Sequence, residues 1–330
     1  MFYMKRRLRK RWVLLAVPLI WLGVWSPSVT AYVTSVKKGT AEPVLKKEDG
    51  KLREVIEKGS RARRDPPVDA RIDRIWKAIP GYNGLEVDKE ATYRSAIKGG
   101  KEKPVTWVFR EIPAKVSLDQ LPVEPIYRGN EKKPMAALMI NVAWGTEHLP
   151  RMLDILEKEG VAATFFLDGS WLNQHPEEAK KLLAKGHELG NHGYSHPLMS
   201  RVSRERIRSE MEKTETLIRK LGVESRFFAP PAGDFNRVVL EEARRMGMKT
   251  VLWTVDTVDW RKTSSPEWMT QRIRKGVGKG SLVLMHPTDR TVQALPQIIG
   301  VIKEKGLRLG TVKEVLSPKR VEVVEPVPSF

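Results

Sequence analysis

Three histidines in the C-terminal half of the chain have types and spacing that could support metal or proton chemistry. His192 and His196 lie four residues apart, so a helical turn between them would direct both imidazoles at one cation. His286 ends an apolar run, where a nearby carboxylate could make it a general acid. A histidine taken alone is more often a buried or capping residue. The hypothesis therefore depends on the three histidines sharing one rim of the fold.

Carboxylates, an aromatic ring and two prolines also follow apolar runs. Asp256, Asp259 and Trp260 come after one run, and Pro230 and Pro231 come after another. Taken alone, such carboxylates are more often helix caps, and the prolines predict a stiff turn. Enzymes built from parallel strands wrapped by helices carry their sites in the loops after the strand C-termini. We therefore expect these residues and the histidines to meet at one end of the fold.

After Lys133, short apolar runs alternate with amphipathic segments, which is typical of a parallel sheet wrapped by helices. The third helix shows the pattern well, because Ser203 is placed to cap its N-terminus and Gly222 to end it. No glycine-rich loop follows the first run, so a nucleotide-binding site loses its main support. Seven such units favour an α/β fold of the distorted (β/α)7-type barrel kind over an open, doubly wound sheet. The strands are predicted at residues 135–142, 162–167, 187–191, 225–229, 250–255, 281–285 and 307–310.

A basic cluster and an uncharged apolar segment at the N-terminus predict export. Basic residues between positions 5 and 11 precede residues 12–36, which contain no charged side chain. This order predicts a cytoplasmic N-terminus, with the rest of the chain on the extracytoplasmic side. The segment is long enough for a single-pass anchor in the cell membrane. Residues 29–31 (Val-Thr-Ala) could instead be the cleavage site of a signal peptide, which would make the protein secreted.

The chain is basic, with a formal net charge of +19, and it contains no cysteine. The charge suits an anionic partner such as a lipid or an acidic wall polymer, but the basic excess lies mainly before residue 134. A nucleic-acid interface would show a stripe of Lys and Arg with interleaved aromatics, so no specific nucleic-acid partner is expected. The absence of cysteine excludes disulfides and thiolate metal ligands.

The organisation along the chain is uneven. Between the N-terminal segment and the barrel there is only modest structure. Four apolar residues there suit one helical face, and residues 105–109 read as a strand. The four are Ile72, Ile75, Trp76 and Ile79. The predicted parts are residues 1–36 as signal peptide or anchor, 37–70 as a basic linker or stalk, 71–133 as a small accessory region, 134–316 as the barrel and 317–330 as a tail.

These motifs, together with the Ala-Ala-Thr-Phe-Phe sequence at 162–166, resemble the polysaccharide deacetylase (NodB-homology) family over residues 134–316. Segments 127–130 and 141–145 are most similar to its sporulation-associated, YlxY-like branch. The resemblance implies a metal-dependent polysaccharide N-deacetylase, a hydrolase of non-peptide carbon–nitrogen bonds. Its substrate would be peptidoglycan or a related N-acetylated cell-wall glycan, and its cofactor a divalent metal, usually zinc.

The resemblance also assigns roles residue by residue. His192 and His196 match the two histidine metal ligands, and His286 matches the general acid that protonates the leaving amine. Asp259 matches the carboxylate that tunes this histidine. The matching substrate-binding positions are Trp260 and Leu284 on the walls of the acetyl pocket, with the turn at Pro230 and Pro231.

The family's first-strand motif, Thr-Phe-Asp-Asp-Gly, is altered in this chain. It would supply the catalytic base and the third metal ligand, but residues 139–145 read Met-Ile-Asn-Val-Ala-Trp-Gly. Counted from the strand, Asn141 replaces the base and Val142 the ligand; counted back from the glycine, Ala143 and Trp144 do. An amide cannot act as a general base and valine cannot bind a metal, so both carboxylate functions are missing.

A third departure is Ala229, where the family has the arginine that orients the base. Compensation is conceivable, because Glu147 and His148 follow the altered motif and Asp168 ends the second strand. Two hypotheses remain open. The chain is a deacetylase-family hydrolase with a degenerate base and metal motif, or it is a catalytically inactive glycan-binding or envelope-assembly protein on the same fold.

Overall fold

The computed structural model describes residue 34 and residues 44–99 and 104–321. The chain divides into two compact units, of which one comprises Met1–Ala62 and Val87–Val108 and the other Arg63–Glu86 and Phe109–Phe330. Apart from Thr34, the predicted export segment lies outside the described residues. Within the described ranges, no helix is long and apolar enough to cross a membrane.

The smaller unit contains helices α3 (Val44–Ala62) and α4 (Lys89–Gly99). Within the segment 37–70, predicted as a basic linker or stalk, the structure has the 19-residue helix α3. Ile56 on α3 is only 2% exposed, and an ion pair of 2.9 Å joins Arg53 to Glu90 on α4. Leu52, Val55 and Ile56 recur at helical spacing in α3, and charge pairs add to the stability of the helix.

The predicted helical face around residue 75 is also wrong, because the chain forms a β-hairpin there. Strands β1 (Arg71–Asp73) and β2 (Lys77–Ile79) pair antiparallel. The carboxylate of Asp73 accepts the backbone N–H groups of Ile75 and Trp76, both at 2.8 Å, and so closes the turn between the strands. The spacing of apolar residues alone could not distinguish this turn from a helix.

A second antiparallel pair joins β3 (Gly84–Val87) to β4 (Phe109–Ile112), so the strand predicted at 105–109 begins later in the chain. The predicted accessory region does not stand apart from the barrel. Ala78 and Ile126 are buried in the same hydrophobic cluster as Met139 of the central sheet. Most of this region therefore folds with the barrel.

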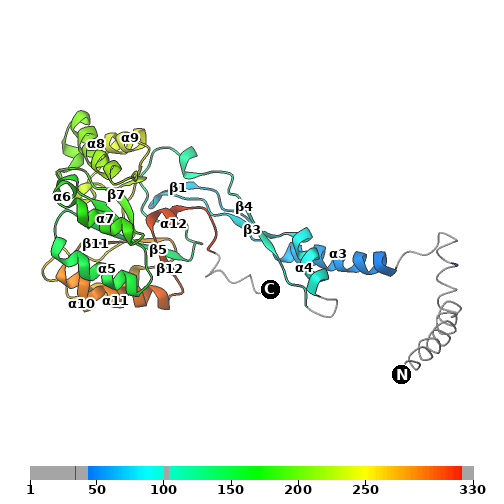
Figure 1. Cartoon of the computed structure of the whole chain (residues 1–330). Helices are drawn as coiled ribbons and strands as arrows, with labels where there is room; N and C mark the ends of the chain where they lie inside the picture. The colour runs from blue at the N-terminus through cyan, green and yellow to red at the C-terminus, as the bar shows by residue number, and fades with distance from the viewer. Residues whose placement is uncertain (1–33, 35–43, 100–103, 322–330) are drawn as a thin grey trace, which may run out of the picture. The chain divides into compact units, whose positions relative to one another are not determined.

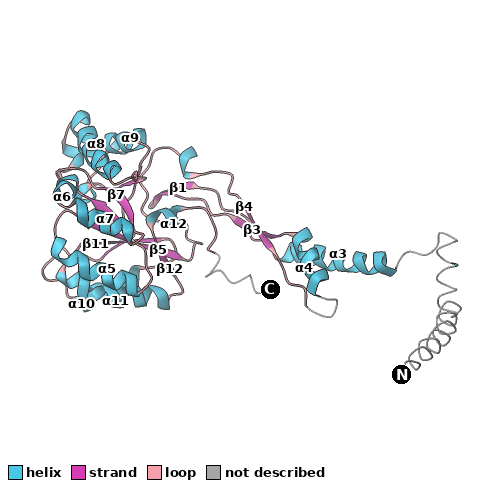
Figure 2. Cartoon of the chain, viewed as in Figure 1, coloured by secondary structure: helices cyan, strands magenta, loops and turns pink. Residues whose placement is uncertain are grey.

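The centre of the larger unit is a parallel sheet of eight strands in the order β10-β11-β5-β6-β7-β8-β9, with β12 paired beside β5. The two ends of this order belong to one chain segment, since β9 and β10 are separated by only four residues. The sheet is therefore curved into a half-barrel, which confirms the α/β class (Figure 2). The strands are β5 (Met135–Val142), β6 (Thr164–Leu167), β7 (Glu188–Asn191), β8 (Phe227–Phe228), β9 (Lys249–Thr250), β10 (Val255–Asp256), β11 (Ser281–Met285) and β12 (Arg308–Gly310).

The single strand predicted at 250–255 is split by a seam in the sheet. Ile126, which comes from outside the predicted barrel, donates its N–H to Thr250 O at 3.0 Å and accepts the N–H of Leu252 at 2.8 Å. The hydroxyl of Thr254 donates to Tyr127 O at 2.8 Å. This inserted segment therefore supplies partners for Thr250, Leu252 and Thr254 where the strand is interrupted.

Helices cover the outer face of the sheet (Figure 1). As predicted, Ser203 caps α8 by accepting the N–H of Arg206, and Gly222 adopts a φ of +84° just after the helix. Alternate residues of each strand face either the barrel interior or these helices. The helices are α5 (Leu149–Lys158), α6 (Gly169–Gln174), α7 (Pro176–Ala184), α8 (Arg204–Lys220), α9 (Arg237–Arg245), α10 (Pro266–Gly276), α11 (Asp289–Glu304) and α12 (Val312–Leu316).

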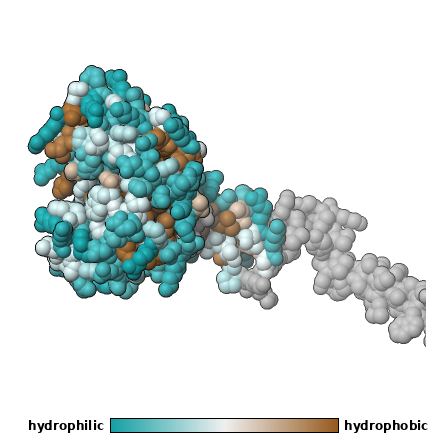
Figure 3. All heavy atoms as spheres, turned by 60° about the vertical axis from the view of Figure 1, so that its left-hand side comes forward, coloured by the Kyte–Doolittle hydropathy of each residue, from teal (hydrophilic) through white to brown (hydrophobic). Residues whose placement is uncertain are grey.

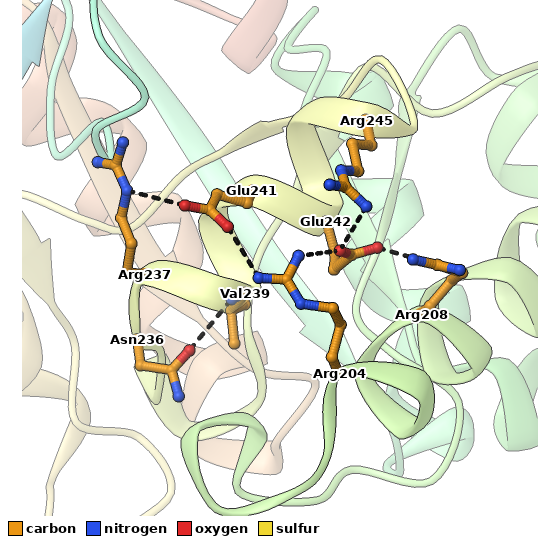
Figure 4. A network of polar contacts seen from close by, with 8 residues as sticks. All are labelled: Arg204, Arg208, Asn236, Arg237, Val239, Glu241, Glu242 and Arg245. Atoms are coloured by element: carbon orange, nitrogen blue, oxygen red, sulfur yellow. Dashed lines mark hydrogen bonds and ion pairs between the residues drawn. The ribbon is translucent and has the colours of Figure 1, made fainter.

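A buried carboxylate joins α8 to α9. Glu242 of α9 is 1% exposed and forms ion pairs with Arg204 at 2.6 Å, Arg208 at 3.0 Å and Arg245 at 3.4 Å (Figure 4). Each carboxylate oxygen has a charged partner, so the group is compensated in the interior. On the face drawn in Figure 3, hydrophilic residues predominate and hydrophobic ones gather in separate patches.

Candidate active site

A pocket with a volume of about 380 Å³ lies at the C-terminal ends of the parallel strands. Its walls come from the ends of six different strands and the loops that follow them, as expected for a site in this architecture. Nine of the residues singled out in the sequence meet here: Asn141, Ala143, Trp144, His192, His196, Asp256, Trp260, Leu284 and His286. The other lining residues are Ala232, Gly233 and Trp253.

His286 is held on one wall by the fully buried carboxylate of Asp259. Oδ1 of Asp259 lies 2.8 Å from Nδ1 of His286, and Oδ2 accepts the His286 backbone N–H at 2.5 Å. The hydroxyl of Thr291 donates to the same Oδ2 at 2.6 Å. Because a carboxylate accepts, Nδ1 carries the hydrogen and Nε2 is left for the pocket. Asp259 does not line the pocket, so it can act only by positioning and polarising His286.

Trp144 covers the imidazole of His286. The two rings stack with centroids 5.9 Å apart and planes inclined by only 6°, and the indole is 48% exposed. The turn behind it is tight, since a Cβ added to Gly145 would lie 2.0 Å from Pro287 O, and the φ of Gly145 is +77°. An exposed indole at the mouth of a pocket is a suitable platform for an apolar face of a ligand.

His192 and His196 also meet in the pocket, although no helical turn separates them. The segment is an irregular loop in which His196 has a φ of +57°, and the two ring centroids lie 5.2 Å apart, edge to face. Nδ1 of His192 donates to Ala229 O at 2.7 Å, so Nε2 keeps its lone pair. Burial, aided by the neighbouring His196, lowers the pKa of His192 to about 3.

Glu210 of α8, which was not among the residues predicted for the site, holds the loop that carries His192 and His196. Its carboxylate is 1% exposed and accepts the N–H groups of Tyr194 at 2.8 Å and Ser195 at 2.7 Å. It also accepts the Ser195 hydroxyl and forms a 2.6 Å ion pair with Arg206. One signal was available, because Glu210 falls on the apolar face of its helix, where a charged residue needs buried partners.

The residues of the altered first-strand motif face different sides of β5. Met139 and Asn141 lie on the interior face of β5, whereas Val142 is fully buried among the residues that pack against the helices. Asn141 is 5% exposed, and its Oδ1 has no hydrogen-bond partner among the described residues. The side chain that occupies the position expected for a base is therefore an amide with an unsatisfied oxygen.

The carboxylates and the imidazole that could have compensated lie elsewhere. The side chain of Glu147 is 74% exposed and lies 3.5 Å from Nε2 of its neighbour His148. Asp168 caps α6 by accepting the N–H of Trp171 at 3.0 Å, and burial raises the pKa of this carboxyl. None of the three lines the pocket. Across residues 44–99 and 104–321, no group of three or more His, Asp or Glu side chains could hold a metal.

The predicted metal site therefore lacks its third protein ligand. Catalytic zinc in proteins has three protein ligands and an open fourth position. Beside the imidazoles of His192 and His196, the pocket is lined by His286, which pairs with Asp259, and by Asp256, whose Oδ1 accepts the N–H of Val258. Neither forms with the two histidines a group that could hold a metal among the described residues. The residues present do not fit a three-ligand zinc centre.

The turn at Pro230 and Pro231 supports the pocket wall without lining it. Ala232, with a φ of +55°, and Gly233 form the lining in its place. A Cβ on Gly233 would lie 2.7 Å from the indole of Trp253, so this close approach requires glycine. The prolines predicted to contact substrate instead determine the shape of the turn.

Comparison with known proteins identifies the family and the fold. The family model for polysaccharide deacetylase matches residues 128–251. The chain is 42% identical over 297 residues to the uncharacterized protein YlxY of Bacillus subtilis, covering 90% of this chain and 92% of that protein. The chain belongs to the polysaccharide deacetylase family. This deacetylase-family chain is also 34% identical over 191 residues to a peptidoglycan-N-acetylglucosamine deacetylase of Bacillus cereus, covering 56% of this chain and 69% of that enzyme.

Solved structures related to this deacetylase-family chain include BA3943 of Bacillus anthracis, a CE4 family pseudoenzyme. The identity is 43% and the TM-score 0.76, over 82% of this chain and 96% of that one. A mutant of BA3943, with 42% identity and a TM-score of 0.76 over 82% of this chain and 99% of that one, is described as having restored enzymatic activity. Both the enzymes and the pseudoenzyme thus share the fold of this chain.

Proposed function

We propose that the pocket receives an N-acetylated sugar of the cell-wall glycan and that the chain is a peptidoglycan deacetylase-family hydrolase with an impaired base side. The observation that carries this proposal is the His286–Asp259 pair on a pocket wall shared with Leu284 and Trp260. An apolar wall suits an acetyl methyl group. Nε2 of His286 suits protonation of the amine that leaves when the amide is cleaved.

Hydrolysis at this site is expected to be slow. A positioned general base contributes about 10²–10⁴-fold to the rate of such a step, and the amide of Asn141 cannot take that role. The family resemblance also implies a divalent metal, usually zinc, which would polarise the N-acetyl carbonyl when bound. With only His192 and His196 as ligands, we expect weak zinc binding.

A second candidate is glycan binding without hydrolysis, which the unsatisfied Oδ1 of Asn141 favours. A buried amide can donate to and accept from a sugar, where a carboxylate can only accept. The similarity to a pseudoenzyme supports this candidate as well. In either case the ligand is an N-acetylated glycan held in the same pocket.

The location belongs to the same proposal. The basic residues before position 12 and the uncharged residues 12–36 favour a single-pass protein of the cell membrane with its barrel outside, or a secreted form after cleavage. The role during sporulation that the resemblance implied is part of the same proposal. A wall glycan is accessible only from the extracytoplasmic side.

Acetate release tests the proposal. The full-length chain is incubated with N-acetylglucosamine oligomers, with added zinc or with chelator, beside a His286→Ala variant. We expect slow release that His286→Ala abolishes. Release that persists in His286→Ala contradicts the assignment of the acid. No release, with retention on insoluble peptidoglycan that depends on Trp260, favours the binding function.

A further inference from the structure

A second depression, with a volume of about 660 Å³, lies along the seam of the sheet beside α10. It exists because residues 251–254 leave the strand ladder where Ile126 is inserted. Its residues come from the β1–β2 turn, the inserted segment, the split strand and α10. They are Trp76, Arg128, Trp253, Thr254, Val255, Asp256, Trp268, Gln271, Arg272, Lys275, Gly276, Gly278 and Ser281.

Three indoles line this groove. Trp268 on α10 is 47% exposed, and the guanidinium of Arg272 lies 5.5 Å from the centre of its ring. Arg128 lies at the same distance from the ring of Trp76. Stacked cations hold these indoles in fixed orientations. Exposed, oriented indoles offer flat apolar surfaces with a polar rim, which suits the alternating C–H and hydroxyl faces of a sugar ring.

The groove also carries an excess of positive charge. Arg128, Arg272 and Lys275 have no ion-pair partner anywhere in the described ranges. Arg272 donates Nε to Asp256 O at 2.7 Å and Arg128 donates Nη2 to Lys279 O at 2.7 Å. These contacts with backbone carbonyls fix the guanidinium groups without neutralising them. Asp256 is the single carboxylate among the lining residues, and its Oδ1 already accepts the N–H of Val258.

The groove adjoins the active-site pocket, because Trp253 and Asp256 line both. A polymer held with one residue in the pocket could therefore place a neighbouring residue in the groove. We propose that the groove is a second binding site for the same glycan strand and that it takes a sugar bearing a carboxylate. The sugar face lies on the indoles, and the carboxylate pairs with Arg272 and Lys275. This inference rests on the proposed function, since it assigns the pocket and the groove to one ligand.

Binding of two oligosaccharides to the full-length chain tests the inference. One probe is a neutral N-acetylglucosamine tetramer, and the other alternates N-acetylglucosamine with the carboxylate-bearing N-acetylmuramic acid at the same length. We expect the anionic oligomer to bind about tenfold more tightly at low salt and to lose most of this advantage near 0.5 M salt. Arg272→Gln with Lys275→Gln should remove the preference and leave binding of the neutral oligomer unchanged. Trp268→Ala should weaken binding of the anionic oligomer at both salt concentrations.

A matched control lies on the same helix. Arg274 pairs with Glu304 at 3.0 Å and is not among the groove residues, so Arg274→Gln removes one positive charge but should leave both affinities unchanged. An equal effect of Arg274→Gln would mean that net charge alone attracts the ligand, and equal affinity for the two oligomers would overturn the proposal. Tighter binding of a poly(glycerol phosphate) than of the anionic oligomer would assign the groove to phosphate polymers and overturn it too.

The same measurements separate this inference from the proposed function. If the neutral oligomer binds and depends on Trp260, but no preference for the anionic oligomer is seen, only the groove assignment fails. If the anionic oligomer binds through Arg272 and Lys275, but neither Trp260→Ala nor His286→Ala has any effect on binding or acetate release, the groove stands and the pocket assignment fails.

Discussion

Asp259 Oδ1 lies 2.8 Å from His286 Nδ1, and the carboxylate that makes this contact has no solvent-exposed surface. Its Oδ2 accepts two further hydrogen bonds, from the His286 backbone and from Thr291. A single side chain therefore fixes the backbone, the tautomer and the ring orientation of the expected general acid. The pair that the proposed function uses as general acid and its positioning carboxylate is thus in place, although the expected base position holds an amide, that of Asn141.

Removing this carboxylate should be costly for the fold. In Asp259→Ala, the His286 N–H and the Thr291 hydroxyl lose their acceptor in the interior, and we expect a loss of about 3–5 kcal/mol in the free energy of unfolding. Thr291→Val removes only one hydrogen bond and should cost about 1 kcal/mol. Urea unfolding followed by circular dichroism measures both. Equal effects of the two substitutions would show that the carboxylate does not organise the site.

Restoring a carboxylate at the base position should raise activity. Asn141→Asp places an acceptor at the pocket wall where the amide oxygen now has no partner, and a general base contributes about 10²–10⁴-fold to such a hydrolysis. Acetate release is the measurement, with added zinc because the same carboxylate could join His192 and His196 as a ligand. The double variant Asn141→Asp with His286→Ala is the control and should be inactive. An unchanged rate in Asn141→Asp would show that the base position lies elsewhere.

The sequence predicted the fold well where a strand consists of one uninterrupted apolar run. The strands β5 and β11 have the predicted bounds, since eight and five consecutive buried residues leave no other interpretation. The strand at 250–255 was split because Ile126 arrives from more than a hundred residues away, a contact that no local pattern reveals. The helix expected near residue 75 failed because one carboxylate, Asp73, closes a turn there.

The sequence predicted which residues line the site, but not which side chains hold them in place. The resemblance identified the histidines, Asp259 and Leu284, and the structure brings them to one rim. Glu210 was missed because its role depends on accepting N–H groups from a loop fifteen residues away. The compensating role considered for Glu147 found no support, since the side chain points into solvent. Whether a side chain of a loop turns toward a pocket is decided by packing that the sequence does not display.

Zinc should dissociate readily from the wild-type chain. Two imidazoles are one protein ligand short of a catalytic zinc centre, so affinity should be weak and chelation should have little effect on stability. We expect less than one zinc per chain after dialysis and an unfolding midpoint that EDTA does not change. His192→Ala should then respond to zinc and EDTA as the wild type does in thermal unfolding. One tightly retained zinc per chain, with a midpoint lowered by EDTA, would contradict this prediction.

The loop that carries His196 should depend on Glu210. Glu210→Ala leaves the N–H groups of Tyr194 and Ser195 and the Ser195 hydroxyl without their acceptor, and we expect a loss of about 2–3 kcal/mol in the free energy of unfolding. Arg206→Gln removes only a partly exposed ion-pair partner of the same carboxylate and should cost less than about 1 kcal/mol. Hydrogen exchange at Tyr194 and Ser195 should accelerate in Glu210→Ala alone. Unchanged exchange at these two amides would show that the loop is held by other contacts.

Stability should fall as the pH drops from about 6.5 to about 4 because of His187. This imidazole is 6% exposed and accepts the N–H of Ala163 on Nδ1, and burial, with a contribution from Lys185, lowers its pKa from 6.5 to about 4. Between pH 6.5 and pH 4, His187 is protonated in the unfolded chain but stays neutral in the folded chain. The free energy of unfolding therefore decreases with decreasing pH. At 1.36 kcal/mol per pH unit the effect amounts to at most about 3 kcal/mol, and it is absent above the unfolded pKa.

Urea titrations of the wild type and His187→Gln between pH 4 and 8 measure this dependence. The glutamine retains an acceptor for the Ala163 N–H but cannot be protonated, so the variant should lose stability less steeply below pH 6.5. The two proteins should have parallel curves between pH 7 and 8, where the histidine is neutral in both states. Parallel curves down to pH 4 would mean that His187 is protonated in the folded chain as readily as in the unfolded one. The acid sensitivity of the barrel would then arise from other groups.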